Sequence, residues 1–265
     1  MNETLLLNLA EFDCIVINTS AGKDSQAMMD YVVRLAREAG CLDKVVAVHA
    51  DLGRVEWAGT KELAEEHCKH YGIPLHVVRR EKGDLLQQVR ERGMWPDSAN
   101  RYCTSDQKRD QVAKLHTAIT ARLGLKRQAR ILNCMGFRRD ESPARAKRVP
   151  LESNKRQTNG KRLVMDWLPI HGWSVAKVWE TIKASGVRHH AAYDKGMPRL
   201  SCCFCIFAPK DALVIAGRAN PELLAEYVAV EQEIGHSFRN GFKIAEVQKA
   251  IADGYEPKNV QGWVM

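Results

Sequence analysis

The stretch DCIVINTSAGKDSQ, residues 13–26, decides the fold class. Its first six residues, 13–18, form a short apolar run that predicts a β-strand buried on both faces. The hexapeptide SAGKDS at 20–25 follows, and Gly22 gives the chain a position where it can turn tightly. A helix is predicted over residues 25–39, because apolar side chains recur there on one face and a glycine follows. A buried strand that passes through a glycine turn into a helix is a repeating unit of parallel α/β sheets.

The alternation of strands and helices continues through the first two thirds of the chain. Further strands are expected at 44–50, 74–78, 130–135 and 163–168, and further helices at 60–71, 83–92 and 106–123. This order predicts an α/β fold with a doubly wound, mainly parallel, five-stranded sheet. Beyond residue 173 the pattern becomes helical, with helices expected at 175–185, 221–234 and 244–253. We therefore expect an α/β domain over residues 1–173 and a helical, cysteine-containing C-terminal part over residues 174–265, packed on the first.

Composition excludes several classes of protein. The chain has 265 residues, 45% hydrophobic and 27% charged, which is typical of globular domains and excludes disordered, collagen-like or coiled-coil chains. No apolar run approaches the roughly 18 residues that a membrane span needs. The N-terminal residues lack the basic segment of a secretory signal. We therefore expect a cytoplasmic protein without a membrane partner. The chain has eight cysteines, and in cytoplasmic proteins clustered cysteines more often bind metal or carry out redox chemistry than form disulfides.

The positive charge of the chain is concentrated in one segment. The formal net charge is +8, and residues 138–162 hold nine Lys or Arg and three acidic residues. Such a concentration favours an anionic ligand: a nucleotide, a sulfate ester or a nucleic acid, DNA or RNA. The alternative is a solvated basic loop. Because residues 143–160 are polar and show no periodicity, we expect a mobile loop there.

The hexapeptide at 20–25 has the groups that a phosphate site needs. Backbone N–H groups at a helix start favour an anion, Ser20 and Ser25 add hydroxyl donors, and Lys23 adds a positive charge. The hexapeptide is neither a G-x-x-x-x-G-K-[ST] loop nor a G-x-G-x-x-G loop. An ordinary capped helix start is the alternative. It resembles the S-G-G-x-D-S loop (PP-loop) of the adenine-nucleotide alpha-hydrolase superfamily, with Ala21 in place of one glycine, and this implies nucleotide binding by Ser20, Ala21, Gly22, Lys23, Asp24 and Ser25.

Other motifs in the chain resemble one branch of that superfamily, the phosphoadenosine phosphosulfate (PAPS) reductase-like family. They are HADLG at 49–53, RYCT at 101–104 with Lys108, and GFRRDES at 136–142 with Arg145. The resemblance runs from about residue 14 to residue 207. It implies a nucleotide site that also includes Asp51, Gly53, Gly136, Arg138, Glu141 and Ser142. It implies catalytic roles for Lys23, Asp24, Arg138 and Arg145, with Asp24 capping the helix or holding Mg²⁺ of an ATP complex.

Three cysteines, Cys202, Cys203 and Cys205, lie together in the sequence, and Cys103 in the RYCT element is a natural fourth ligand. Four thiolates suit a [4Fe–4S] cluster or a structural zinc ion; free or redox-active thiols are the third possibility. The family resemblance favours iron, because adenylyl-sulfate reductases and DNA-phosphorothioation proteins with a PP-loop carry such clusters. Cys134 is a reserve ligand or a thiol that carries sulfur. The other cysteines, Cys14, Cys41 and Cys68, fit buried packing.

The resemblance also bears on the reaction. Sulfonucleotide reductases attack sulfur with a cysteine of a late E-C-G-x-H element, and this chain has no cysteine after Cys205. We therefore expect an ATP-using enzyme that adenylylates an acceptor, releases pyrophosphate and transfers sulfur to it, with a protein such as a cysteine desulfurase as donor. The acceptor would be DNA or RNA bound through residues 138–162. The alternatives are a reductase of adenylyl sulfate or PAPS that makes sulfite, and a nucleotide-binding regulatory protein with a structural zinc.

Overall fold

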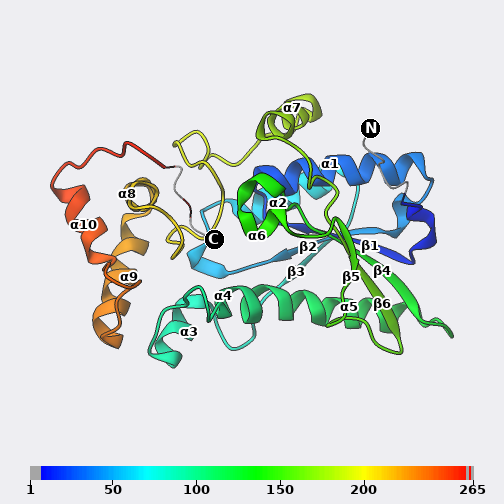
Figure 1. Cartoon of the computed structure of the whole chain (residues 1–265), viewed down its shortest axis with the longest axis horizontal. Coiled ribbons are helices and arrows are strands. Elements are labelled where there is room, and N and C mark those ends of the chain that lie inside the picture. Colours follow the sequence, from blue (N-terminus) through cyan, green and yellow to red (C-terminus); the bar gives the residue numbers. More distant parts are fainter. Residues whose placement is uncertain (1–6, 261–262, 264–265) are drawn as a thin grey trace. The chain divides into compact units, whose positions relative to one another are not determined.

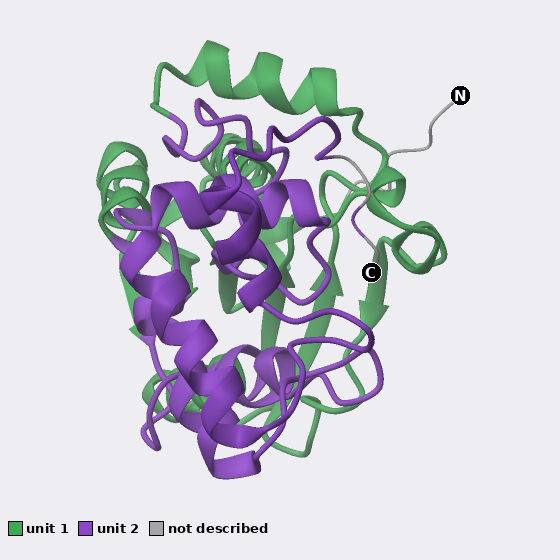
Figure 2. Ribbon diagram, turned by 90° about the vertical axis from the view of Figure 1, so that its left-hand side faces the viewer, with its two compact units in different colours: residues 1–49, 62–77, 112–188 green, residues 50–61, 78–111, 189–265 purple. Residues whose placement is uncertain are grey.

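The computed structural model describes residues 7–260 and residue 263. The chain divides into two compact units (Figure 2). The first unit comprises residues 1–49, 62–77 and 112–188, and the second comprises residues 50–61, 78–111 and 189–265. Each unit is thus assembled from three segments of the chain. The domain boundary expected after residue 173 stays a prediction.

A six-stranded sheet forms the centre of the first unit, in the order β3-β2-β1-β4-β6-β5 (Figure 1). The strands are β1 (Cys14–Thr19), β2 (Val45–Ala50), β3 (Leu75–Val78), β4 (Ala129–Cys134), β5 (Leu151–Ser153) and β6 (Arg162–Trp167). Parallel pairing joins β1 to β2 and β4, and β4 to β6, whereas β5 is antiparallel to β6. The predicted mainly parallel, doubly wound α/β fold is confirmed. The chain order reverses beside β1, and ligands of such sheets bind at that point, outside the carboxyl ends of the strands.

The basic segment is more ordered than its sequence suggests. We expected a mobile loop at 143–160, and this expectation is wrong. The segment contains the short helix α6 (Pro143–Ala146) and the strand β5, which adds a sixth strand to the predicted five. Strand β5 is only three residues long and is held by pairing with β6, so no local periodicity announces it.

Helices cover the sheet of the first unit. They include α1 (Lys23–Glu38), α2 (Thr60–Tyr71), α5 (Asp110–Leu123) and α7 (Val175–Ser185). Helix α1 packs on α7 and on β1, and its apolar face supplies the fully buried Met28 and Val32. Ser174 caps α7 by accepting from the backbone N–H of Lys177, and Gly186 ends it in the left-handed conformation. The resulting core fixes the end of β1 and the start of α1.

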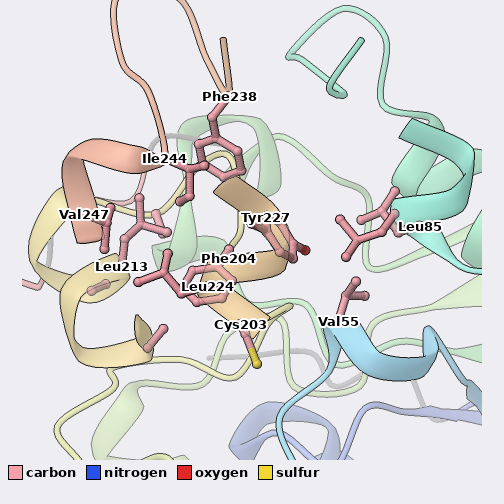
Figure 3. Close-up of a cluster of buried hydrophobic side chains, with 14 of the residues drawn as sticks. Val55, Leu85, Cys203, Phe204, Leu213, Leu224, Tyr227, Phe238, Ile244 and Val247 are labelled. Carbon is pink, nitrogen blue, oxygen red and sulfur yellow. The ribbon is translucent and has the colours of Figure 1, made fainter. Parts of the chain in front are cut away.

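The second unit is helical around an aromatic core. Its elements include α3 (Leu85–Arg92), α4 (Tyr102–Thr104), a π-helix (Ser105–Arg109), α8 (Lys210–Ala219), α9 (Pro221–Ile234) and α10 (Ala245–Ala252). The rings of Trp95 and Tyr227 stack at 5.3 Å. Phe204 meets Tyr227 edge-on at 4.9 Å, and both lie in the cluster that Figure 3 shows. Helix α8 was not predicted, although its apolar residues 212–214 and 216 were a usable signal. No helix in the described part of either unit is long and apolar enough for a membrane span.

Candidate functional site

The phosphate loop, residues 20–22, connects β1 to α1. Gly22 is the N-cap of α1 and has no side chain to occupy the first N–H groups of the helix, which leaves them for an anion. Ala21 is fully buried and has φ +53°, a left-handed conformation that favours glycine. The hydroxyl of Ser25 closes the loop, because it donates to the carbonyl of Gly22 (2.9 Å) and accepts from the N–H of Ser20 (3.2 Å). Ser25 therefore shapes the loop, and its contact with phosphate stays a prediction.

A chain of charges lies behind the loop. Lys23 is only 5% exposed, and its Nζ lies 3.1 Å from Asp24 Oδ2. The other oxygen, Asp24 Oδ1, accepts from Arg138 Nε at 2.6 Å. Arg138 is 3% exposed and also donates to both carboxylate oxygens of Asp140. Burial lowers the pKa of Arg138, but Asp24 and Asp140 outweigh burial, so its pKa is raised and it stays charged.

These contacts give Arg138 and Asp24 a structural role that the sequence did not predict. Arg138 braces the start of α1 through Asp24, and a direct contact with phosphate stays a prediction. Asp24 has one oxygen on Lys23 and the other on Arg138, so a Mg²⁺ ion at Asp24 would replace an existing ion pair. Asp140, which completes the brace, was not among the predicted site residues although it lies within the quoted motif.

The GFRRDES element folds as a turn against the phosphate loop. A Cβ on Gly136 would lie 3.0 Å from backbone atoms of Asp24 and Ser25, so only glycine fits there without a shift. Glu141 accepts from the N–H of Arg138 (2.8 Å) and pairs with Arg145, whose guanidinium lies 4.3 Å from the centre of the Phe137 ring. The hydroxyl of Ser142 caps α6 by accepting from the backbone N–H of Arg145 (3.2 Å). The expected nucleotide contacts of Gly136, Glu141 and Ser142, and catalysis by Arg145, stay predictions.

Asp51 and Gly53 belong to the second unit. The carboxylate of Asp51 accepts from the N–H of Gly53 at 2.7 Å, and Gly53 has φ +67°. A Cβ on Gly53 would lie 2.9 Å from a guanidinium nitrogen of Arg79. The glycine is therefore required by the turn itself, and the role of both residues in nucleotide binding stays a prediction.

Three of the four predicted cysteine ligands share one neighbourhood in the second unit. Burial raises the pKa of Cys202, and the charges of Cys205 and Cys103 raise it further, while Lys108 opposes them. Burial also raises the pKa of Cys205, which interacts with Cys103 as well. Buried thiols that influence one another suit a soft metal, because a bound cation stabilises the thiolate form. As placed, however, no group of three or more His, Cys, Asp or Glu in the described residues could hold a metal ion.

Cys203 and Cys134 are placed differently. Cys203 is 1% exposed in the apolar core around Tyr227, its N–H donates to the carbonyl of Val55 (2.9 Å), and burial raises its pKa to about 12 (Figure 3). Cys134 is fully buried in the core of the first unit, and burial raises its pKa far above the ordinary value. The sulfur donors that the structure places in one neighbourhood are thus Cys103, Cys202 and Cys205, and the four-cysteine set stays a prediction.

A glycine-capped loop that follows a central strand of a doubly wound sheet and opens a helix is the arrangement of PP-loop α/β proteins. The chain belongs to the phosphoadenosine phosphosulfate reductase domain family, whose model matches residues 14–208. This result confirms the resemblance seen in the sequence.

Individual relatives are distant. The uncharacterized protein MJ0066 of Methanocaldococcus jannaschii is 27% identical over 195 residues, which cover 72% of this chain and 36% of that protein. A tRNA-cytidine(32) 2-sulfurtransferase of Citrifermentans bemidjiense is 27% identical over 96 residues, covering 36% of this chain and 34% of the relative. The chain thus spans about a third of the length of the curated relatives it matches.

Solved structures with a similar chain course include two enzymes. The PAPS reductase from Candida auris has 15% identity and a TM-score of 0.48, and covers 73% of this chain and 83% of its own. The U34-tRNA thiolase NcsA from Methanococcus maripaludis, solved with its [4Fe-4S] cluster, has 13% identity and a TM-score of 0.48, and covers 94% of this chain and 76% of its own.

Proposed function

We propose that the protein is an ATP-dependent sulfurtransferase that adenylylates an oxygen of a nucleic acid and replaces that oxygen with sulfur. The observation that carries the proposal is the phosphate loop: a glycine-capped helix start at the end of β1, with the buried Lys23 beside it. Fixed N–H dipoles and a cation at this place stabilise charge that develops on phosphate oxygens.

The reaction balances in two steps. First, an acceptor oxygen attacks the α-phosphorus of ATP, the bond to the β-phosphate oxygen breaks, and pyrophosphate leaves. Second, sulfur at the oxidation level of sulfide attacks the acceptor carbon, and AMP leaves with the original oxygen. Neither step is a net oxidation or reduction, provided that a donor supplies sulfur as sulfide. Lys23 and the loop N–H groups hold phosphate, while Arg138 keeps Asp24 and the start of α1 in place.

In this proposal, the thiols of the second unit bind the metal centre that holds the sulfur for transfer. Cys103, Cys202 and Cys205 would hold a [4Fe–4S] cluster, since they are partly buried sulfur donors that interact with one another. Such a cluster, when bound, supplies Lewis-acidic iron to which sulfur can bind for transfer. Zinc in the same site would be structural.

Relatives and charge support a nucleic-acid acceptor. Curated relatives named as tRNA-cytidine(32) 2-sulfurtransferases match part of this chain. The basic segment, residues 138–162, places several exposed Lys and Arg side chains on the same unit as the phosphate loop. Cations on such a surface bind a polyanion and release counterions, so its binding is steeply dependent on salt.

Sulfonucleotide reduction is the second candidate, because the family takes its name from it. That reaction needs a thiolate that attacks sulfur and forms a mixed intermediate, which a second thiol then resolves. Residues 206–265 of this chain contain no cysteine, and the thiols of Cys202, Cys203 and Cys205 have raised pKa values. Both facts favour sulfur transfer over reduction.

The experiment supplies the anaerobically purified protein with ATP, tRNA or DNA and sulfide, and measures pyrophosphate release and thiolated product. A parallel sample receives adenylyl sulfate or PAPS with reduced thioredoxin, and sulfite is measured. We expect pyrophosphate that depends on nucleic acid, reduced about a hundredfold in Lys23→Ala. Lys177→Ala, which removes a surface lysine that pairs with Glu180, is the matched control and should act like the wild type. Sulfite formation without ATP turnover would make the second candidate correct.

A further inference from the structure

A ladder of buried polar side chains crosses three strands of the first unit. Asn18 on β1 donates to Asn133 Oδ1 on β4 (2.7 Å), and Asn133 donates to Asp166 Oδ1 on β6 (2.7 Å). Asn133 and Asp166 are direct partners in the parallel register of β4 and β6. Asn154, which follows β5, donates to both oxygens of Asp166, at 3.1 and 3.0 Å. The ladder therefore runs from the strand before the phosphate loop to the basic segment.

Asp166 is the charged member of this ladder. It is 8% exposed, and a buried carboxylate is costly unless hydrogen bonds satisfy its oxygens. Its two oxygens face different partners. Oδ1 is shared between Asn133 and Asn154, whereas Oδ2 contacts the basic segment, through Asn154 at 3.0 Å and through Arg148 at 4.0 Å.

The contact with Asn154 orders a turn. The N–H of Asn154 donates to the carbonyl of Val164 (2.8 Å), and its side-chain oxygen accepts from the N–H of Gln157 (3.1 Å). The turn 154–158 carries two exposed cations, Lys155 and Arg156. The other exposed cations of the segment are Arg139, Lys147, Arg148 and Lys161.

We propose that Asp166 is the positioning residue of a polyanion-binding surface, and that its hydrogen bonds with Asn154 fix the turn 154–158 and the cations of the basic segment on the sheet. The inference rests on the proposed function for the identity of the polyanion, which is the nucleic-acid acceptor. Preorganised cations bind phosphates with less loss of side-chain freedom than mobile ones. A negative charge inside a cationic surface thus improves anion binding by geometry, although by charge alone it opposes it.

The effect of Asp166 on geometry and the effect of its charge change anion affinity in opposite directions, so a substitution can distinguish them. Asp166→Asn keeps Oδ1 for Asn133 and Asn154, but it replaces Oδ2 with an NH₂ group that faces the NH₂ group of Asn154. Glu152→Gln is the matched control: Glu152 also pairs with Arg148 (2.9 Å), it is not a member of the ladder, and the change removes the same single charge. Affinity for bulk tRNA and for a DNA duplex is measured over a series of salt concentrations, together with acceptor KM and kcat, ATP affinity and urea unfolding.

We expect Asp166→Asn to bind nucleic acid about tenfold more weakly, with a salt slope smaller by about one. Acceptor KM should rise while kcat and ATP affinity stay within about twofold, a split that general loss of stability does not produce. Glu152→Gln should bind as tightly as the wild type or more tightly. Tighter or unchanged binding by Asp166→Asn would overturn the inference.

A second variant tests the inference in case the first variant does not fold. If Asp166→Asn does not fold, Asn154→Ala removes the contact from the segment side, and the same tenfold loss is expected; unchanged binding would overturn the inference. A wild-type protein that binds neither tRNA nor DNA would overturn the acceptor in the proposed function as well. A wild type that binds, with variants that bind equally, would overturn the positioning role alone.

Discussion

The two units bury their chemically active groups in opposite ways. In the first unit, buried ions face other ions or amides: Lys23 with Asp24, Asp24 with Arg138, and Asp166 with two asparagines. In the second unit, the buried Glu231 and Asp211 collect backbone N–H groups instead, whereas the buried Asp84 pairs with Arg54. Glu231 accepts from the N–H groups of Phe238 and Ile244, and the thiols lie beside an aromatic core.

The difference indicates what each unit is prepared to bind. Charges that already hold one another in a fixed geometry cost little reorganisation when a phosphate arrives, so the first unit is preorganised for an anion. Burial raises the pKa values of the Cys202 and Cys205 thiols, which would lose their protons when a cation binds, as the metal site proposed for the second unit requires.

The largest effect should come from the cysteines. Cys202→Ala should lose all bound iron and the visible absorbance of the cluster, because its thiol interacts with Cys205 and Cys103. Cys203→Ala, the adjacent matched control, should keep most of the iron, because that side chain packs in the apolar core. Iron and sulfide are measured after anaerobic purification. Equal loss in both variants would restore the four-cysteine set, and colourless protein with one zinc ion would contradict the cluster.

The cysteines also show what could not be predicted from the sequence. Apolar runs predicted the strands well, because a strand buried on both faces is set by its own residues. Whether Cys202 or Cys203 faces Cys103 depends on how the loop meets residues a hundred positions away. Arg138 is similar: its charge suggested a phosphate ligand, but Asp24 occupies its Nε, and this pairing spans 114 positions. Local patterns predicted most of the elements, although not β5 or α8, and the side-chain pairings were set by tertiary contacts.

Gly136→Ala should be the strongest single-methyl change in the first unit. The added Cβ would meet backbone atoms of Asp24 and Ser25 at 3.0 Å, and backbone cannot rotate away as a side chain can. We expect a loss of about 2–3 kcal/mol in the free energy of unfolding and ATP binding weakened about tenfold. Gly160→Ala, with nothing within 4 Å of its Cβ, should change neither. Urea unfolding and ATP titration are the measurements, and equal effects of the two variants would mean that the turn does not press on the phosphate loop.

His116 is an exception to the pairing of polar groups in the first unit. It is 1% exposed, neither ring nitrogen has a hydrogen-bond partner among the described residues, and burial lowers its pKa from 6.5 to about 4. Between these values the unfolded chain binds more protons than the folded chain, so stability falls as pH falls through this window. From pH 7 to pH 5 its share is about 2 kcal/mol. His116→Leu should remove that slope in urea unfolding. A variant with the wild-type slope would assign the pH dependence to other groups.

The smallest effect concerns Ala21. It is the single non-glycine residue with a positive φ in the described part of the chain, and it lies in the phosphate loop. The left-handed conformation costs a residue with a Cβ about 1–2 kcal/mol, whereas glycine adopts it freely and loses about 0.5–1 kcal/mol more chain entropy on folding. Ala21→Gly should therefore stabilise the protein by roughly 0.5–1 kcal/mol.

The control for Ala21→Gly is Ala118→Gly, at an exposed position of α5, where glycine should cost about 1 kcal/mol. Opposite signs in the two variants, measured by urea unfolding, would show that the loop stores strain. ATP affinity of Ala21→Gly should stay within about twofold, because the N–H groups that face the anion begin at α1 and keep their place. If Ala21→Gly destabilises as much as Ala118→Gly, the loop is relaxed as it stands. In that case the proposed anion site would depend on the ion pairs of Lys23, Asp24 and Arg138 and not on strain in the loop. The difference between the two units would then be one of charge alone.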